Sequence, residues 1–550
     1  MSCCPKTLLF LLLLAGGCSS VQPPPQSYIY PDDHPIPRPK KRKPSLVVEI
    51  LDKSISHQIK QLFDLPRTVR KLVGHPYQAL NVDAFDEVPN STWFTNRNGT
   101  APMSLEEIRR GPNQYYGPDT TGAWTVLKLK STDAIPGLTI VDARGHQYLI
   151  KFDPPEFSEL PSGTQTVAAK LLYAAGYNVP ENYVVWLDPK RLQMATDAVL
   201  SVGTNDNRAP TSKRSMARAD LQRLLERANP QGQPLIRALA SRALPGIPVG
   251  PWSYKGIRRD DPNDIYLHEH RREIRGFYII ASWLNHANMK EENTQDMYDP
   301  QARFLTHYLT NFDGSIGSNS TRPSNPRRGQ ANSFDLKDSL IRLVTLGLYV
   351  HDYERAPRSI PHPSVGYLGN DLFKPRAWKA MYPVPAFENM TRRDAFWGTK
   401  IVTSFTNDQI AAAVSTGAYS NPAAASSMTR FLIERRDRIG HYWFARLNTL
   451  DRFKMADYGT LEFTDLAVAR GYADSAETRY RCQVFAATGA TLFKDKLKNT
   501  VLTLDPAWRQ HAHIAVALLA QRPHYSARPI LVYLQAAEKG WRIIGLRRRD

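Results

Sequence analysis

Six polar side chains that could do chemistry fall in three short stretches of this sequence. In chain order they are Lys151, His286, Asn288, Asn293, Asn311 and Asp313. Three of the six are asparagines. An amide has the shape of a carboxylate, but it accepts no proton at neutral pH and brings no formal charge to a hard cation. The residue types by themselves therefore favour ligand binding over proton transfer.

Other motifs give weaker signals. His268-Glu269-His270 is similar to part of a zinc-protease helix, but that motif needs a second histidine four residues after the first, and position 272 is Arg272. We therefore predict hydrogen-bonded structural histidines here, and a buried, hydrogen-bonded His307. The sequence contains no P-loop, no nucleophile elbow and no Cys-x-x-Cys pair.

Alternating and helical patterns predict the elements that carry Lys151. Residues 124–130 and 138–141 read as strands, and a turn at 142–145 leads to a third strand over 147–152, which gives an antiparallel hairpin with Lys151 near its end. Ser162 is a candidate N-cap for a helix that Gly176 ends, and a further strand follows at 183–186.

The asparagines follow the clearest helix of the sequence, 273–286, which has a broad apolar stripe. A polar loop over 285–294 follows that helix, and a strand is predicted over 304–311. Residues 203–219 read as a surface loop and 221–244 as an inserted helix. Residues 395–446 are predicted to be mostly helical.

The order of hairpin lysine, helix, His-x6-Asn loop and strand ending Asn311-Phe312-Asp313-Gly314 resembles the protein-kinase-like fold. The likeness is to its HipA-like and lipid-kinase-like branches and to uncharacterised bacterial envelope proteins. It covers roughly 124–455. It implies an α+β fold, a two-lobed kinase-like core with helical insertions, and ATP with Mg²⁺ or Mn²⁺ as cofactors.

The resemblance also implies roles for individual residues. Lys151 matches the lysine that neutralises nucleotide phosphates, and Asn293 matches a metal-holding asparagine. Gln165 stands where a helix carboxylate pairs with that lysine. Asn288, in the loop with His286, stands at the catalytic-aspartate position, and Asn311 stands at the strand-end metal aspartate.

Three carboxylates of the family pattern are thus replaced by amides, which predicts weak divalent-metal binding and an electropositive pocket. We favour a pseudokinase-like domain that binds a nucleotide, another anion or a partner protein. An active phosphotransferase is the alternative, with Asp313, Glu291, Glu292 or Asp296 forming a rearranged metal site. A non-catalytic structural protein of the envelope is the third reading.

The N-terminus predicts export. Lys6 precedes an apolar run over 8–15 that is too short to span a bilayer, and Leu-Ala-Gly-Gly-Cys resembles the lipobox of bacterial lipoproteins. The resemblance implies removal of residues 1–17 and a palmitate-type lipid anchor on Cys18. Ser19 after that cysteine implies sorting to the outer membrane of the cell envelope.

Residues 18–45 are rich in proline and lack an apolar period, which predicts a stiff, extended tether. Its basic run at 38–43 either contacts anionic head groups or is simply solvated. The net charge is +19 over 550 residues, with basic residues dispersed along the chain. We therefore expect anionic lipid or polysaccharide, and an envelope protein, as partners, and no nucleic acid.

A chain of this length exceeds what one hydrophobic core usually serves. We expect a core over 46–455, with an N-lobe at about 46–190 that begins with a helix over 46–63. An insertion follows at about 203–250 and a C-lobe at about 250–455. Short alternating runs from 456 to 550 predict a small β-sandwich-like domain of immunoglobulin character.

Overall fold

The computed structural model describes most of the chain after residue 21. The described residues are 22–27, 29–43, 70, 76–130, 137–202, 212–333, 335, 341–346, 348–456, 459–523 and 527–548. The predicted signal peptide, Cys18 and the predicted helix over 46–63 lie outside the described residues. Among the helices that are described, none has the length and apolar character needed to cross a bilayer.

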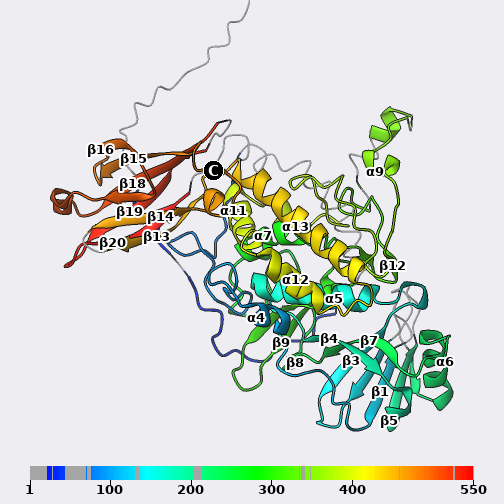
Figure 1. The fold of residues 1–550 in the computed structure, drawn as a ribbon. Helices are drawn as coiled ribbons and strands as arrows, with labels where there is room; N and C mark the ends of the chain where they lie inside the picture. Colours follow the sequence, from blue (N-terminus) through cyan, green and yellow to red (C-terminus); the bar gives the residue numbers. More distant parts are fainter. Residues whose placement is uncertain are drawn as a thin grey trace, which may run out of the picture.

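A seven-stranded sheet, at the lower right of Figure 1, forms one end of the fold, with the strand order β4-β7-β3-β2-β1-β5-β6. The strands are β1 (Trp124–Lys130), β2 (Gly137–Val141), β3 (Gln147–Phe152), β4 (Asn182–Leu187), β5 (Leu192–Val202), β6 (Ser212–Ser215) and β7 (Ile236–Arg242). The strands β1, β2 and β3 are antiparallel neighbours. The predicted hairpin that carries Lys151 is therefore confirmed.

The helix predicted over 221–244 is wrong for most of its length, because the later part of this segment joins the sheet. Only α6 (Arg218–Ala228) is helical within the helix expected over 221–244, and β7 lies between β3 and β4. In β7, Ile236, Ala238 and Ala240 are buried in the core of the sheet. Pairing of β7 with strands on both sides outweighs the helical propensity of its Leu and Ala residues.

The helix α5 (Leu160–Ala175) packs against β4 and β7 on one face of the sheet. Gly176 ends it with a φ of 119°, as predicted, and a Cβ at this position would collide with the ring of Phe94. The prediction of Ser162 as the N-cap of this helix is wrong, because the helix begins at Leu160. Ser162 lies inside the first turn, where its backbone N–H and its hydroxyl donate to Asp153 at 2.8 and 2.6 Å.

The rest of the core is mainly helical, in agreement with the prediction for 273–286 and 395–446. Its helices are α4 (Leu105–Arg110), α7 (Arg272–Trp283), α9 (Asp352–Arg355), α10 (Pro385–Glu388), α11 (Arg392–Val402), α12 (Asn407–Ser415) and α13 (Pro422–Phe444). The central helix α7 is buried along its whole length and packs against α10, α11 and α13. Its side chains Phe277, Ile280 and Trp283 all enter the largest core cluster, and their burial stabilises the helix.

Two small sheets are formed by short strands before and after α7 in the sequence. The first contains β8 (Ile247–Pro248), β9 (Thr294–Tyr298) and β10 (Leu305–Leu309), in the order β10-β9-β8. The second pairs β11 (Ser318–Asn319) with β12 (Arg322–Pro323). The hairpin of β9 and β10 matters for the site, because it connects the two loops that carry the asparagines.

A separate β domain, at the upper left of Figure 1, follows α13. One sheet holds β13 (Leu450–Ala456), β14 (Thr460–Asp465) and β17 (Val501–Thr503). The other has the order β16-β15-β18-β19-β20 and contains β15 (Arg479–Ala486), β16 (Thr491–Leu497), β18 (Ile514–Gln521), β19 (Ile530–Ala536) and β20 (Trp541–Arg547). A short helix, α14 (Leu466–Ala469), follows β14.

These two antiparallel sheets share one apolar core, so the expected sandwich is present. Two details differ from the prediction. The domain begins at Leu450, whose buried side chain belongs to this core, and not at 456. The sequential order of β18, β19 and β20 within one sheet is also unlike the Greek-key order of an immunoglobulin domain.

The proline-rich segment is extended, but it is not a free tether. Its described residues run along the body: Tyr533 donates to the carbonyl of Gln22 at 2.9 Å, and Ile36 is only 3% exposed in a small apolar cluster. The basic run is also engaged, because Arg42 forms an ion pair with Glu291 at 2.9 Å. Contacts distant in sequence hold this segment, which proline content alone does not reveal.

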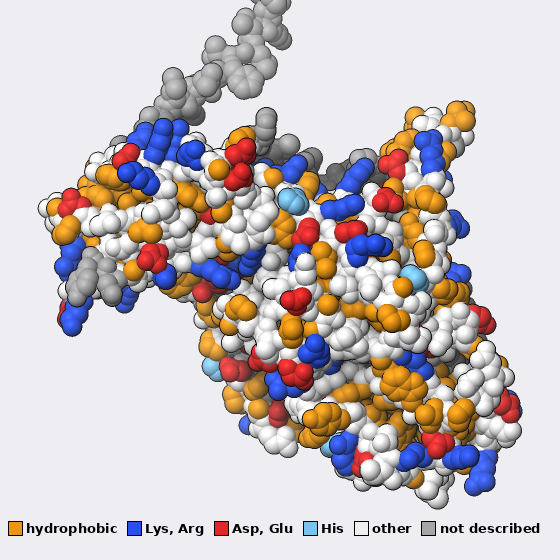
Figure 2. All heavy atoms as spheres, viewed as in Figure 1, with side chains coloured by type: hydrophobic (Ala, Val, Ile, Leu, Met, Phe, Trp, Pro, Cys, Tyr) orange, Lys and Arg blue, Asp and Glu red, His pale blue; other side chains and the backbone are white. Residues whose placement is uncertain are grey.

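A buried ion network joins the helical core to the β domain. Asp86 pairs with Arg272 at 2.5 Å and with Arg548 at 3.7 Å, and Arg548 pairs with Asp451 at 2.8 Å. Burial alone would raise the pKa of Asp86, but the neighbouring guanidinium charges lower it overall. On the surface the charges are mixed, and Figure 2 shows Lys and Arg interspersed with Asp, Glu and hydrophobic side chains on the face that it draws.

Candidate functional site

The structure brings together the three asparagines that the sequence singled out. The Nδ2 of Asn311 donates to the Oδ1 of Asn293 at 3.3 Å, and the Nδ2 of Asn293 donates to the backbone carbonyl of Asn288 at 2.9 Å. We call Asn288, Asn293 and Asn311 the amide cluster. Three positions to which the resemblance assigns roles in the site therefore lie together.

The hairpin of β9 and β10 explains this convergence. Asn293 stands immediately before β9, and Asn311 stands two residues after β10. Because the two strands are antiparallel, with Leu309 opposite Thr294, the start of one and the end of the other meet. A backbone hydrogen bond of 2.9 Å from Thr310 to Asn293 fixes the junction.

The turn after α7 sets the position of His286 and Asn288. Asn285 has a φ of 48°, a left-handed conformation that asparagine tolerates better than most residues, and its side chain accepts a hydrogen bond from Trp378 at 2.9 Å. This turn leaves His286 buried, with its Nδ1 2.8 Å from the hydroxyl of Ser315.

The imidazole of His286 is neutral at physiological pH. Burial, reinforced by the charge of Arg328, lowers its pKa to about 3. A neutral imidazole bonded to Ser315 orients the loop that carries Asp313. His286 was predicted at a catalytic position, and its geometry suits a positioning role.

Several oxygen atoms at this site lack a hydrogen-bond donor. Within the described part of the chain, Asn288 Oδ1, Asn311 Oδ1 and Asp313 Oδ1 are buried and have no hydrogen-bond partner. A buried acceptor left unsatisfied costs about 1–3 kcal/mol, so such atoms usually mark the place of a water, an ion or a ligand. Amide and carboxylate oxygens are also the ligands that Mg²⁺ and Mn²⁺ accept.

Arg328 also belongs to this site, although no motif of the sequence points to it. Its side chain is half-buried, and its guanidinium donates to the carbonyl of Gly314 and to Asn319 Oδ1, both at 2.7 Å. A Cβ on Gly314 would collide with this guanidinium and press on Asn288, which shows that Arg328 lies beside the amide cluster. Burial lowers the pKa of Arg328 to about 10, against the opposing effect of Asp313, so it remains charged.

Lys151 and Gln165 lie on the same side of the sheet. Lys151 and Leu149 are two positions apart on β3, so their side chains share one face of the sheet. Strand pairing through β7 places Asn182 of β4 on that same face. The side chain of Asn182 donates to the backbone carbonyl of Gln165 on α5 at 3.3 Å. Gln165 is buried, and its Nε2 has no partner among the described residues. The described contacts include no hydrogen bond that joins Lys151 to Gln165 or to the amide cluster.

Most carboxylates near the cluster are occupied by other partners. Glu291 pairs with Arg42, Glu292 with Lys290 at 3.1 Å, and Asp296 with both Arg258 at 2.8 Å and His307 at 2.7 Å. The described residues contain no group of three or more His, Cys, Asp or Glu side chains arranged to hold a metal. Asp313 is the carboxylate of the predicted set that a rearranged metal site could still use.

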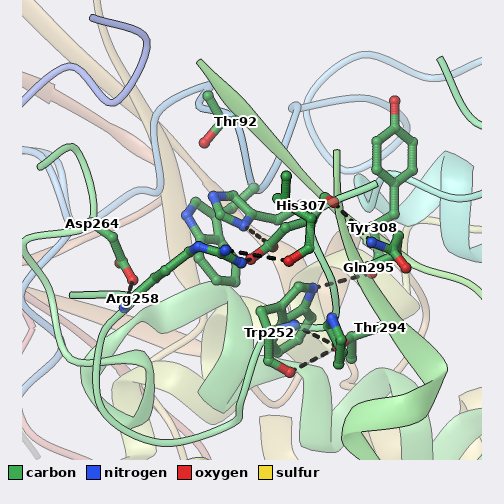
Figure 3. Close-up of polar contacts among 12 residues, drawn as sticks. Thr92, Trp252, Arg258, Asp264, Thr294, Gln295, His307 and Tyr308 are labelled. Atoms are coloured by element: carbon green, nitrogen blue, oxygen red, sulfur yellow. Dashed lines mark hydrogen bonds and ion pairs between the residues drawn. The ribbon is translucent and has the colours of Figure 1, made fainter. Parts of the chain in front are cut away.

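A second buried cluster, part of which Figure 3 shows, contains His268 and His307. His307 stacks on Trp93 with ring centroids 3.6 Å apart, and His268 bonds Asp264 at 2.7 Å. The guanidinium of Arg271 lies 4.6 Å from the ring of Trp93. Both predictions about hydrogen-bonded histidines are confirmed, and these residues form part of the core beside the site.

The chain was also compared with known proteins, and no family model, no curated protein and no solved structure matched it.

Proposed function

We propose that this chain is a lipid-anchored envelope protein whose α+β core is a pseudokinase-like domain that binds a nucleotide or another anionic ligand. One observation carries the proposal, the hydrogen-bonded convergence of Asn288, Asn293 and Asn311. These residues come from two loops that a kinase-like protein uses for its catalytic and metal-binding side chains, and they stand in the predicted order.

The charge balance of the site supports binding without catalysis. None of the three amides can take a proton from an acceptor hydroxyl. The charges beside them are the half-buried Arg328 and the buried Asp313, one of each sign, whereas a kinase-like site concentrates negative charge for its metal ions. A ligand that carries its own negative charge would meet the guanidinium of Arg328 without needing a divalent cation.

An active phosphotransferase is the second candidate, and one observation favours it. Asp313 is only 7% exposed, and its Oδ1 has no hydrogen-bond partner among the described residues. With Asn288 Oδ1 and Asn311 Oδ1, it offers one charged and two neutral oxygens to Mg²⁺ or Mn²⁺. Such a set would hold the metal that bridges nucleotide phosphates, although more weakly than a set of carboxylates.

Thermal denaturation with ATP separates these readings. We expect ATP to raise the Tm equally with EDTA and with Mg²⁺ or Mn²⁺, and no phosphate to be transferred. Stabilisation that requires the metal, together with phosphate release or transfer, would support the phosphotransferase. Absence of any response to ATP would contradict both and leave the structural envelope protein. Arg328→Gln tests the contact directly, because it should abolish the response.

The proposal includes attachment of the protein to the outer membrane through a lipid on Cys18. The lipobox-like sequence before Cys18 supports lipid modification of that cysteine, and Ser19 supports an outer-membrane destination. The high net positive charge supports additional attraction to anionic lipid or polysaccharide of the envelope.

A further inference from the structure

A cavity of about 590 Å³ lies apart from the amide cluster. It opens between α7, α10, α13 and the segment 376–392, and Arg528 of the β domain also lines it. Asn288, Asn293, Asn311 and Arg328 are not among its lining residues. Its volume falls within the range of about 300–1,000 Å³ typical of small-molecule sites.

The inner wall of this cavity is aromatic. Tyr278, Trp378 and Trp443 line it and are at most 8% exposed, and Phe387 joins them. The rings of Tyr278 and Trp378 meet edge to face at 5.6 Å, so the wall is held rigidly. The inner wall is therefore apolar, and the ring of a ligand can pack against it.

One hydrogen-bond donor in this wall has no acceptor. The indole Nε1 of Trp443 is buried, and it has no hydrogen-bond partner among the described residues. By contrast, the hydroxyl of Tyr278 donates to backbone carbonyls at 2.9–3.1 Å, and Trp378 Nε1 donates to Asn285. The polar atoms of Tyr278 and Trp378 are thus occupied within the protein, and these two side chains present mainly carbon to the cavity.

The mouth of the cavity is positively charged. Arg376, Arg392 and Arg528 line it, are exposed, and form no ion pair with any described residue. Lys379 also lines it and pairs with Asp335 at 2.5 Å. Glu388 is the one acidic side chain among the described lining residues. Unpaired guanidinium groups bind phosphate through paired hydrogen bonds.

We propose that this cavity binds a small organic phosphate that carries a ring. The ring would pack against the apolar inner wall, and the phosphate would meet Arg376 and Arg528. The inference does not depend on the amide cluster, because the two sites share no residue. Sugar phosphates and nucleoside monophosphates both have this chemistry.

Isothermal titration of the full chain with glucose 6-phosphate, AMP, glucose and inorganic phosphate tests the proposal. We expect at least one of the two organic phosphates to bind, and glucose and inorganic phosphate to bind at least about tenfold more weakly. The stronger of the two identifies the ligand class. Failure of both organic phosphates to bind would overturn the proposal.

Matched variants locate the binding. Arg376→Ala with Arg528→Ala should weaken the organic phosphate at least about tenfold. Arg430→Ala with Arg481→Ala removes the same charge from exposed positions outside the cavity and should leave binding unchanged. Asn288→Asp with Asn311→Asp should also leave it unchanged, which separates this site from the amide cluster. Equal effects of the two arginine pairs would overturn the proposal.

Discussion

The Oδ1 of Asp394 lies 3.1 Å from the Nε of Arg272, and both side chains are at most 1% exposed. The other carboxylate oxygen of Asp394 lies 3.4 Å from Arg275 and accepts the backbone N–H of Thr391 at the start of α11. One carboxylate thus connects two arginines of α7 to the N-terminus of α11. A buried ion pair of this kind is costly to break, because the remaining charge has no water to replace its partner.

Asp394→Asn should therefore destabilise the chain strongly. The amide keeps the shape of the carboxylate but leaves Arg272 and Arg275 short of negative charge, and we expect a loss of about 3–5 kcal/mol in the free energy of unfolding. Urea denaturation measures it. The control is Arg430→Ala, which removes an exposed ion pair on α13 and should cost less than about 1 kcal/mol. Similar losses for the two variants would contradict this account of the network.

Stability should fall in acid partly because of His286. Its pKa is about 3 in the folded chain and about 6.5 in an unfolded one, so between these values the unfolded chain binds one more proton there. The contribution is complete above pH 6.5 and declines as the pH falls, by about 1.4 kcal/mol per pH unit.

His286→Asn should remove this pH dependence, because the amide is neutral throughout and can still bond Ser315. The measurement is the free energy of unfolding at pH 7 and pH 4.5, and the variant should lose about 2–3 kcal/mol less than the wild type over this interval. His441→Asn, at an exposed position on α13, serves as the control. An unchanged slope in His286→Asn would show that the imidazole is protonated in the fold.

Restoring acids to the amide cluster should create metal affinity. Asn288→Asp with Asn311→Asp adds two negative charges beside oxygen atoms that lack partners, and we expect Mn²⁺ to bind at least about tenfold more tightly than to the wild type. Calorimetric titration with Mn²⁺ measures the change. Asn499→Asp, at an exposed turn of the β domain, is the matched control. Equal Mn²⁺ affinity in all three proteins would discredit the assigned positions.

Lipid attachment should depend on Cys18 alone. Cys18→Ala should abolish incorporation of a clickable palmitate and move the protein from the membrane fraction to the soluble fraction. Cys482→Ala is the control, because burial in β15 raises the pKa of that thiol to about 12 and makes it unreactive. Label that persists on Cys18→Ala would refute the lipobox assignment.

Local signals account for what the sequence predicted well. The turn before β3 and the left-handed glycine at 176 are fixed by residues within a few positions, so the hairpin and the end of α5 were found. The convergence of Asn293 and Asn311 was also predictable, because a short hairpin brings its own ends together.

Long-range packing accounts for what the sequence did not reveal. The pattern of β7 suits a helix, and only its partners β3 and β4 make it a strand. Arg328 lies in a basic, proline-containing stretch that gives no sign of a place in the site, yet its guanidinium donates to the carbonyl of Gly314. Neither placement follows from spacing within one segment.

The contact of Gln22 with the β domain has a consequence for the orientation of the protein on a membrane. Gln22 is held by Tyr533 and Arg547 on β19 and β20, and it lies four positions after Cys18. Four residues span at most about 14 Å, so a lipid on Cys18 would keep the β domain at the height of the head groups. The β domain would then face the bilayer, and the short linker would restrict rotation of the protein relative to the membrane.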